Sequence, residues 1–191
     1  MKRALAGMTL ALLLGACVFS SEAPLFSEDE AVTPFAEGVQ FTWVENGGEG
    51  REVVTYHRAG AAYQIGPDGR EEAIHALFID LPETPEDDYI VQVRLRPEEP
   101  VRAYAYMWRI AGGYRTVASP GAFPKGSIGE TAMQTKCMRM SMRECRFATA
   151  ADVRAFYLEA VYPAFVVGDA IPGDYMDQLT SPPAPQSPPR K

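Results

Sequence analysis

The chain has 191 residues and a formal net charge of −7, with 47% hydrophobic and 23% charged residues. This composition is typical of one soluble globular domain and argues against a chain that is disordered or embedded throughout in a membrane. The acidic balance argues against nucleic acid as the main partner. The sequence also lacks the G-x-x-x-x-G-K-[ST], G-x-G-x-x-G and H-E-x-x-H motifs of nucleotide and zinc sites.

The first seventeen residues have the pattern of an export signal. Met1-Lys2-Arg3 is a basic start, and residues 4–14 form an apolar run. The run is too short to cross a bilayer core, which takes roughly 20 helical residues, but it suits a secretory signal peptide. It ends in Leu14-Gly15-Ala16-Cys17, which resembles the lipobox of bacterial lipoproteins.

The resemblance implies a signal peptide over residues 1–16 and a diacylglycerol-bearing, acylated Cys17. Each buried methylene adds about 0.8 kcal/mol of membrane affinity, so two or more acyl chains anchor a protein stably. In that family an aspartate after the cysteine commonly retains the protein in the inner membrane. Val18 stands there in this sequence, which implies an outer-membrane anchor with the body in the periplasm. Cleavage would change the net charge from −7 to −9, so anionic head groups should repel the body.

The chain contains three cysteines. If Cys17 carries lipid, Cys137 and Cys145 remain, and the oxidising periplasm favours a disulfide between them. A redox or metal-binding pair is the alternative, although the C-x-x-C spacing typical of such pairs is absent.

Residues 17–37 are expected to form a lipidated tether, because serine, proline and the acidic residues 28–30 are frequent there. A β-rich periplasmic domain is expected over residues 38–168. Between residues 38 and 119, about seven segments alternate apolar and polar residues and are separated by glycine- and proline-containing turns. This pattern predicts an antiparallel meander, sandwich or small barrel of about seven to eight strands.

The C-terminal part favours one helix. Residues 119–136 read as irregular, and Thr149 is a good N-cap for a helix whose apolar residues recur at helical spacing as far as Val161. Pro163 is expected to end or kink this helix, and residues 165–167 to add a strand. Residues 169–191 are expected to be an extended proline-rich tail. The fold class is therefore mainly β, a β-rich α+β arrangement.

We expect no catalytic residue and no cofactor. His57 and His75 lie in expected strands with no nucleophile motif near them, which favours ordinary structural histidines. The acid pairs Glu71-Glu72, Asp87-Asp88 and Glu98-Glu99 lie in expected turns, where solvated charge is the simpler explanation.

Two groups of residues suggest binding. Methionine thioethers suit Cu(I), but Arg139 and Arg143 would repel a cation, so adaptable core packing is the favoured reading of the cluster Met133, Met138, Met140 and Met142. Aromatic residues on neighbouring strands could line an apolar cavity or simply stabilise the sheet; these are Tyr63, Tyr89, Tyr104, Tyr106, Trp108 and Tyr114.

The sequence therefore predicts a lipoprotein anchored in the outer membrane that acts as a non-enzymatic envelope interaction or structural module. Its partners would be membrane lipid, through acylated Cys17, and a protein of the envelope. A lipocalin-like carrier of an apolar ligand is the alternative, and a Met-rich Cu(I)-binding protein is the third reading.

Overall fold

The computed structural model describes residues 18–45, 51–66, 74–84, 87–94, 102–141, 144–168 and 176–180. The prediction of a mainly β fold is confirmed, but these residues form twelve strands rather than seven to eight. The strands are β1 (Val18–Ser21), β2 (Ala31–Val32), β3 (Val39–Glu45), β4 (Arg51–Ala59), β5 (Ala62–Gly66), β6 (Ile74–Asp80), β7 (Tyr89–Arg94), β8 (Arg102–Ile110), β9 (Gly113–Val117), β10 (Cys137–Ser141), β11 (Glu144–Phe147) and β12 (Met176–Thr180).

The helices are η1 (Glu28–Glu30), η2 (Pro120–Ala122), α2 (Ile128–Lys136), α3 (Ala150–Phe156) and η3 (Tyr157–Val166). The first two are 3₁₀ turns, and η3 continues α3 as a π-helix. None of the described helices has the length and apolarity needed to traverse a membrane.

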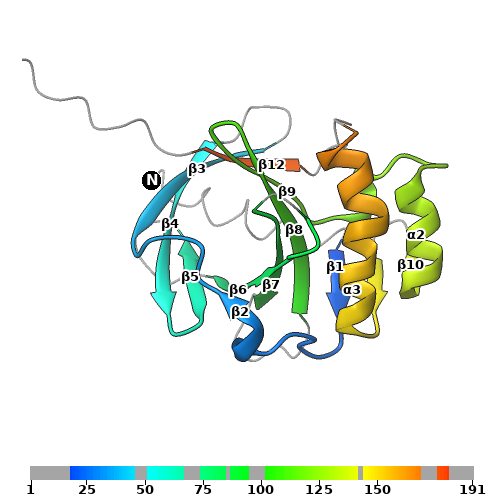
Figure 1. The fold of residues 1–191 in the computed structure, drawn as a ribbon, viewed down its shortest axis with the longest axis horizontal. Helices are drawn as coiled ribbons and strands as arrows, with labels where there is room; N and C mark the ends of the chain where they lie inside the picture. The colour runs from blue at the N-terminus through cyan, green and yellow to red at the C-terminus, as the bar shows by residue number, and fades with distance from the viewer. Residues whose placement is uncertain are drawn as a thin grey trace, which may run out of the picture.

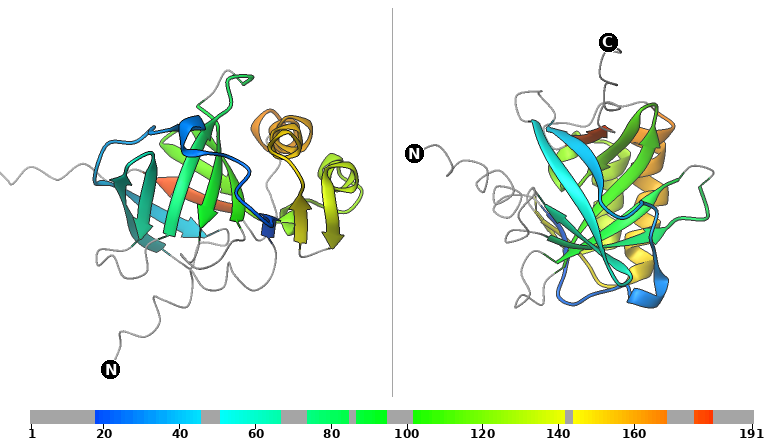
Figure 2. Two further views of the ribbon diagram at one scale, coloured as in Figure 1. Left: turned by 90° about the horizontal axis from the view of Figure 1, so that it is seen from below. Right: turned by 90° about the vertical axis from the view of Figure 1, so that its left-hand side faces the viewer.

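Eight of the strands close into a barrel. The order is β8-β7-β6-β5-β4-β3-β12-β9 and back to β8, and every neighbouring pair is antiparallel. The seven alternating segments expected between residues 38 and 119 correspond to β3–β9, which follow one another as a meander. Figure 2 shows these strands around a ring, with the helices to one side.

The strand β8 pairs with three other strands, because one of its edges is divided between two of them. On one edge it pairs with β7, and on the other its residues 106–110 pair with β9 while residues 102–104 pair with β1. Parallel pairing of β1 with β11, followed by β10, extends the sheet beyond the barrel as a side sheet of three strands, β1, β11 and β10. In Figure 1, β1 lies between the barrel and the helices.

Aromatic rings fill the barrel interior. Phe35, from the segment before β3, is buried and its ring centroid lies 5.2–5.9 Å from those of five other rings, which belong to Phe41, Tyr56, Tyr63, Phe78 and Tyr114. Most of these contacts are edge-to-face, the geometry that the ring quadrupoles favour. Phe35 is therefore the centre of the core inside the barrel.

A second core lies between the sheet and the helices. Tyr104, Tyr106 and Trp108 alternate along β8 with the interior residues and point to this outer side. The ring of Tyr106 contacts that of Phe156 on α3, and the ring of Trp108 stacks on that of Phe165 on η3. The helix predicted after Thr149 thus covers one face of the sheet, and Thr149 accepts a hydrogen bond from the Asp152 amide as its N-cap.

Four local predictions differ from the structure. Within the expected tether, residues 18–21 and 31–32 are strands, and Phe19 is completely buried. Within the expected tail, residues 176–180 form β12, whose pairing with β3 and β9 closes the barrel. In both places, backbone pairing with a neighbouring strand decides the conformation, which local composition does not reveal.

The other two differences concern helices. Residues 128–136 form α2 instead of irregular chain, because Ser127 caps the Glu130 amide while Glu130 accepts from the Gly126 amide. Residues 165–167 add no strand, because the helix continues past Pro163 through η3. A wider π turn tolerates the missing proline N–H, and the Val167 amide bonds to the Tyr162 carbonyl at 3.0 Å.

Replacing Phe35 with alanine should remove the ring at the centre of the barrel core. A Phe→Ala change at a buried site costs about 3–5 kcal/mol, because the neighbouring rings cannot fully close the cavity. Urea unfolding of the full chain measures this change in the free energy of unfolding. Val53, which is half-exposed on β4, is the control, since Val53→Ala should cost less than about 0.5 kcal/mol. Equal losses in both variants would contradict the assigned role of Phe35.

Candidate functional site

The chain between β1 and β2 crosses the outer face of the barrel, and we call residues 22–30 the N-terminal segment. It is held there by Gln92 of β7, which is buried. The Gln92 side-chain oxygen accepts from the amides of Leu25 and Phe26 at 2.9 and 3.1 Å, and its side-chain nitrogen donates to the Phe26 carbonyl at 3.0 Å. Tyr104 donates to the same oxygen at 3.2 Å. One buried amide thus fixes the backbone of the segment.

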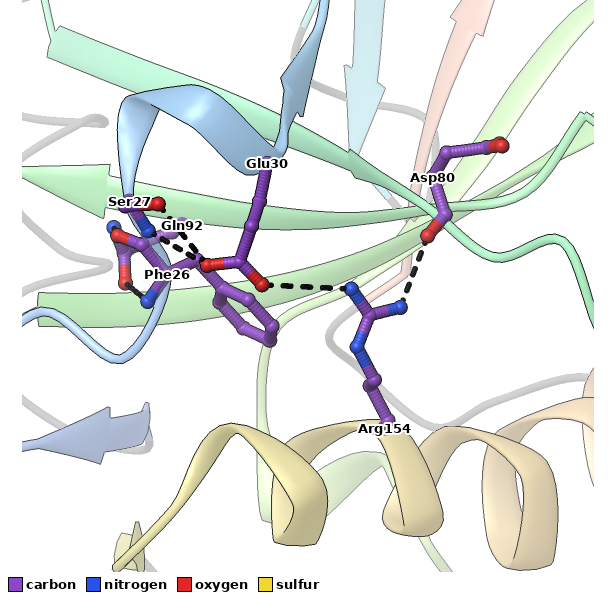
Figure 3. A network of polar contacts seen from close by, with 6 residues as sticks. All are labelled: Phe26, Ser27, Glu30, Asp80, Gln92 and Arg154. Atoms are coloured by element: carbon purple, nitrogen blue, oxygen red, sulfur yellow. Dashed lines mark hydrogen bonds and ion pairs between the residues drawn. The ribbon is translucent and has the colours of Figure 1, made fainter.

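The far end of the segment is tied to the helix layer. The Glu30 carboxylate accepts from the amide and hydroxyl of Ser27, which closes η1 as a capping box. Arg154 of α3 lies 3.9 Å from that carboxylate and donates to the Asp80 carbonyl at 3.1 Å (Figure 3). Its guanidinium also lies 5.3 Å from the centroid of the Phe26 ring. The segment therefore connects the barrel to the helices.

A pocket of about 450 Å³ lies between this segment and the outer face of the barrel, and we call it the segment pocket. One side is formed by the N-terminal segment and the other by strands β4–β8. Its lining residues are Pro24, Phe26, Ser27, Glu28, Ala59, Ala62, His75, Ala76, Leu77, Gln92, Arg94 and Arg102. This mixture of apolar and polar groups on a fixed frame is typical of small-ligand sites.

Three basic residues of the pocket lie side by side on adjacent strands. His75 of β6 is paired with Arg94 of β7. Val93 is paired with Ala103, so Arg94 and Arg102 of β8 stand at the next positions of the same register. Directly opposite residues on one sheet face have Cβ atoms about 4.5–5.5 Å apart. The register thus produces a row of one imidazole and two guanidinium groups, which we call the basic row.

The positive charge of Arg94 disfavours the charged forms of its two neighbours in the basic row. Burial and the nearby positive charge of Arg94 lower the pKa of His75, and the same two causes lower the pKa of Arg102. Within the described chain, the side chains of His75 and Arg94 form neither a hydrogen bond nor an ion pair. Glu28 lines the pocket as well, and its side chain is exposed. The arrangement has the chemistry of an anion site.

Cys17 lies outside the described residues. The predicted disulfide between Cys137 and Cys145 is present, with Cα atoms 5.2 Å apart, and it joins β10 to β11 at the edge of the side sheet. Cys145 is completely buried beside Phe147, so the disulfide is part of the second core. The described residues contain no group of three or more histidine, cysteine or acidic side chains arranged to hold a metal ion.

The methionines of the proposed Cu(I) cluster have different surroundings. Met133 is buried on α2 within the second core, whereas Met138 on β10 is 61% exposed. Met140 contributes backbone to β10, but its side chain lies outside the description, as does all of Met142. Core packing is therefore the role of Met133, whereas Met138 is exposed on a different element.

The strand alternation divides the six aromatic residues proposed for an apolar cavity. Tyr63, Tyr89 and Tyr114 belong to the core inside the barrel, with the last partly buried, whereas Tyr104, Tyr106 and Trp108 face the helices. Because Phe35 fills the space between the interior rings, we assign no ligand site there.

The other acid and base candidates have structural contacts. His57 lies 3.0 Å from Glu37, and Asp87 pairs with Arg109. Asp88 is buried and accepts from the Tyr157 hydroxyl at 2.5 Å. The pairs Glu71-Glu72 and Glu98-Glu99 lie outside the described residues.

Sequence reasoning considered His75 only as a catalytic base and missed Gln92, Arg94 and Arg102. One signal was present: each sits on the polar face of a segment that alternates with apolar residues. The pairing register that aligns them across three strands is set by turns and core contacts far from these residues.

Comparison of the chain with protein-family models, with curated proteins and with solved structures gives no match.

Gln92→Leu should detach the N-terminal segment. The change leaves the Leu25 and Phe26 amides without their acceptor, and each buried unsatisfied group costs about 1–3 kcal/mol. We expect a loss of at least about 2 kcal/mol in the free energy of unfolding, measured with urea, together with faster proteolysis within residues 22–30. The control is Gln64→Leu at a half-buried residue of β5. This change should lower the free energy of unfolding by less than about 1 kcal/mol. Unchanged proteolysis in Gln92→Leu would refute the assigned role.

The titration of His75 tests the basic row directly. Since burial and Arg94 both lower its pKa, removal of the Arg94 charge in Arg94→Gln should raise the pKa of His75 toward its ordinary value of about 6.5. NMR titration of both imidazole rings measures the change, with His57 as the internal reference because it pairs with Glu37 instead. A His75 pKa that does not rise in Arg94→Gln would contradict the geometry.

Proposed function

We propose that the protein is a lipid-anchored, non-enzymatic binding module of the bacterial envelope, held on the periplasmic side of the outer membrane by acylated Cys17. The proposal combines the lipobox-like end of the export signal with the segment pocket. The observation that carries it is the position of β1, which begins at Val18, the residue directly after Cys17.

The short connection between anchor and fold supports this role. Phe19, Ser20 and Ser21 are all buried, and β1 pairs on both sides, with β8 and β11. An acylated Cys17 would therefore join the membrane to the folded domain without a long flexible linker. The same stretch of chain continues into the N-terminal segment, so the residues that follow the anchor also form one wall of the pocket.

Binding fits the described groups better than catalysis does. The acidic candidates Asp87 and Asp88 are engaged by Arg109 and Tyr157, and His57 by Glu37. The basic row lines an accessible pocket in a chain that is acidic as a whole. A module that is attached to a membrane and offers a fixed pocket beside the attachment point suits the capture of a ligand or partner there.

Cys17→Ser should abolish incorporation of a radiolabelled fatty acid and leave the unprocessed precursor in a bacterial host, because the thioether can form only at the cysteine. The matched control is the double variant Cys137→Ser/Cys145→Ser, which removes the other two thiols and should keep the label per molecule of protein. Normal labelling of Cys17→Ser would refute the anchor.

A further inference from the structure

We propose that the segment pocket binds the phosphate group of a small organic ligand, with Arg94 and Arg102 contacting the phosphate oxygens and His75 providing a third polar contact. The inference extends the proposed binding role by naming the ligand chemistry. It rests on that role, but it needs no lipid on Cys17.

The basic row favours an oxyanion with several acceptor oxygens. Two guanidinium groups stand at neighbouring register positions, and each presents a planar set of N–H donors that matches phosphate or carboxylate oxygens. A carboxylate has two oxygens, whereas the phosphate of a monoester has three terminal oxygens and can accept from Arg94, Arg102 and His75 together. His75 continues the row on the other side of Arg94. A bound phosphate would relieve the repulsion among these groups.

The rest of the pocket fits an organic part beside the phosphate. Phe26, Leu77 and Ala62 contribute apolar surface within the same space of about 450 Å³. Gln92 contributes to the wall, but its amide is already engaged by the N-terminal segment. Exposed Glu28 also lines the space, so it should oppose an anion, and its removal should strengthen binding.

Two sources can supply such a group: a soluble phosphate monoester or the phosphomonoester headgroup of a phosphatidic acid. Pro24, the first residue of the segment that lines the pocket, follows Cys17 by seven residues. An extended chain covers at most about 25 Å over that length. The pocket is thus close enough to an anchored Cys17 for either source, and the shared chemistry is the phosphate.

The test measures binding by isothermal titration of the full chain in neutral detergent at pH 7, with a micelle blank subtracted. The probes are glycerol 3-phosphate and dihexanoyl phosphatidic acid, which are both phosphate monoesters. Binding of the first alone identifies a soluble ester, binding of the second alone identifies a lipid headgroup, and binding of both shows that the phosphate suffices. Absence of saturable binding for both probes overturns the proposal.

Matched variants locate the site. Arg94→Gln should weaken binding at least tenfold, because a hydrogen bond to a charged group contributes about 1.5–3 kcal/mol. Arg109→Gln removes the same charge from an exposed residue of β8 that pairs with Asp87, and binding should stay within twofold. Glu28→Gln should tighten binding. Equal weakening by Arg94→Gln and Arg109→Gln would show attraction by diffuse charge and overturn the site.

A second readout is independent of variant folding. In the unmodified chain, the NMR signals of the His75 ring should shift on addition of the binding probe while those of His57 stay fixed. Unshifted His75 signals at saturation would overturn the site. Because Cys17→Ser should bind the probe like the parent chain, loss of the anchor and loss of phosphate binding are separate outcomes.

Discussion

The divided pairing of β8 is the constraint on which the rest of the structure depends. One edge of this strand meets β9 over residues 106–110 and β1 over residues 102–104, so the barrel closes at one end of β8 and opens into the side sheet at the other. Successive side chains of a strand point to opposite faces. The same strand therefore contributes Met107 to the barrel core and Tyr106 to the core beneath the helices.

Placement of the N-terminal chain follows from that division. Once β1 occupies the free edge of β8, the following residues must cross the outer face of the barrel, where Gln92 satisfies their backbone groups. Burial of a side-chain amide costs desolvation free energy, which is offset only when its donor and acceptor atoms form hydrogen bonds, as they do here. The segment thereby covers part of the barrel face that carries Arg94 and Arg102. The space between the segment and this face is the segment pocket.

The sequence predicted the regular part of this fold and missed the parts that depend on distant partners. Strands β3–β9 follow an alternation that any reader of the sequence can find, since one face packs on a core and the other does not. In β1, however, Ser20 and Ser21 are buried although they are polar, so the sequence of this strand resembles that of a linker. The Ser21 hydroxyl shares a hydrogen bond with that of Tyr104, 83 residues away. A local sequence pattern cannot predict such a distant partner. The signal for α2 was local, because Ser127 and Glu130 have capping-box spacing, but surrounding glycine and proline residues favoured an irregular reading.

The basic row shows why a candidate binding site is harder to predict than a strand. His75, Arg94 and Arg102 each look like the solvent-facing position of an amphipathic strand, and singly each would be an ordinary surface residue. They become one site only because the register sets them side by side and the N-terminal segment, held by Gln92, covers them. The N-terminal segment and the basic row are thus parts of one arrangement. The hydrogen bonds from Gln92 that fix the backbone of the segment also hold the segment over the basic row. With Cys17 anchored as proposed, a force on the chain at that end would reach the pocket through β1 within a few residues. Attachment and ligand capture would then share the same short piece of backbone.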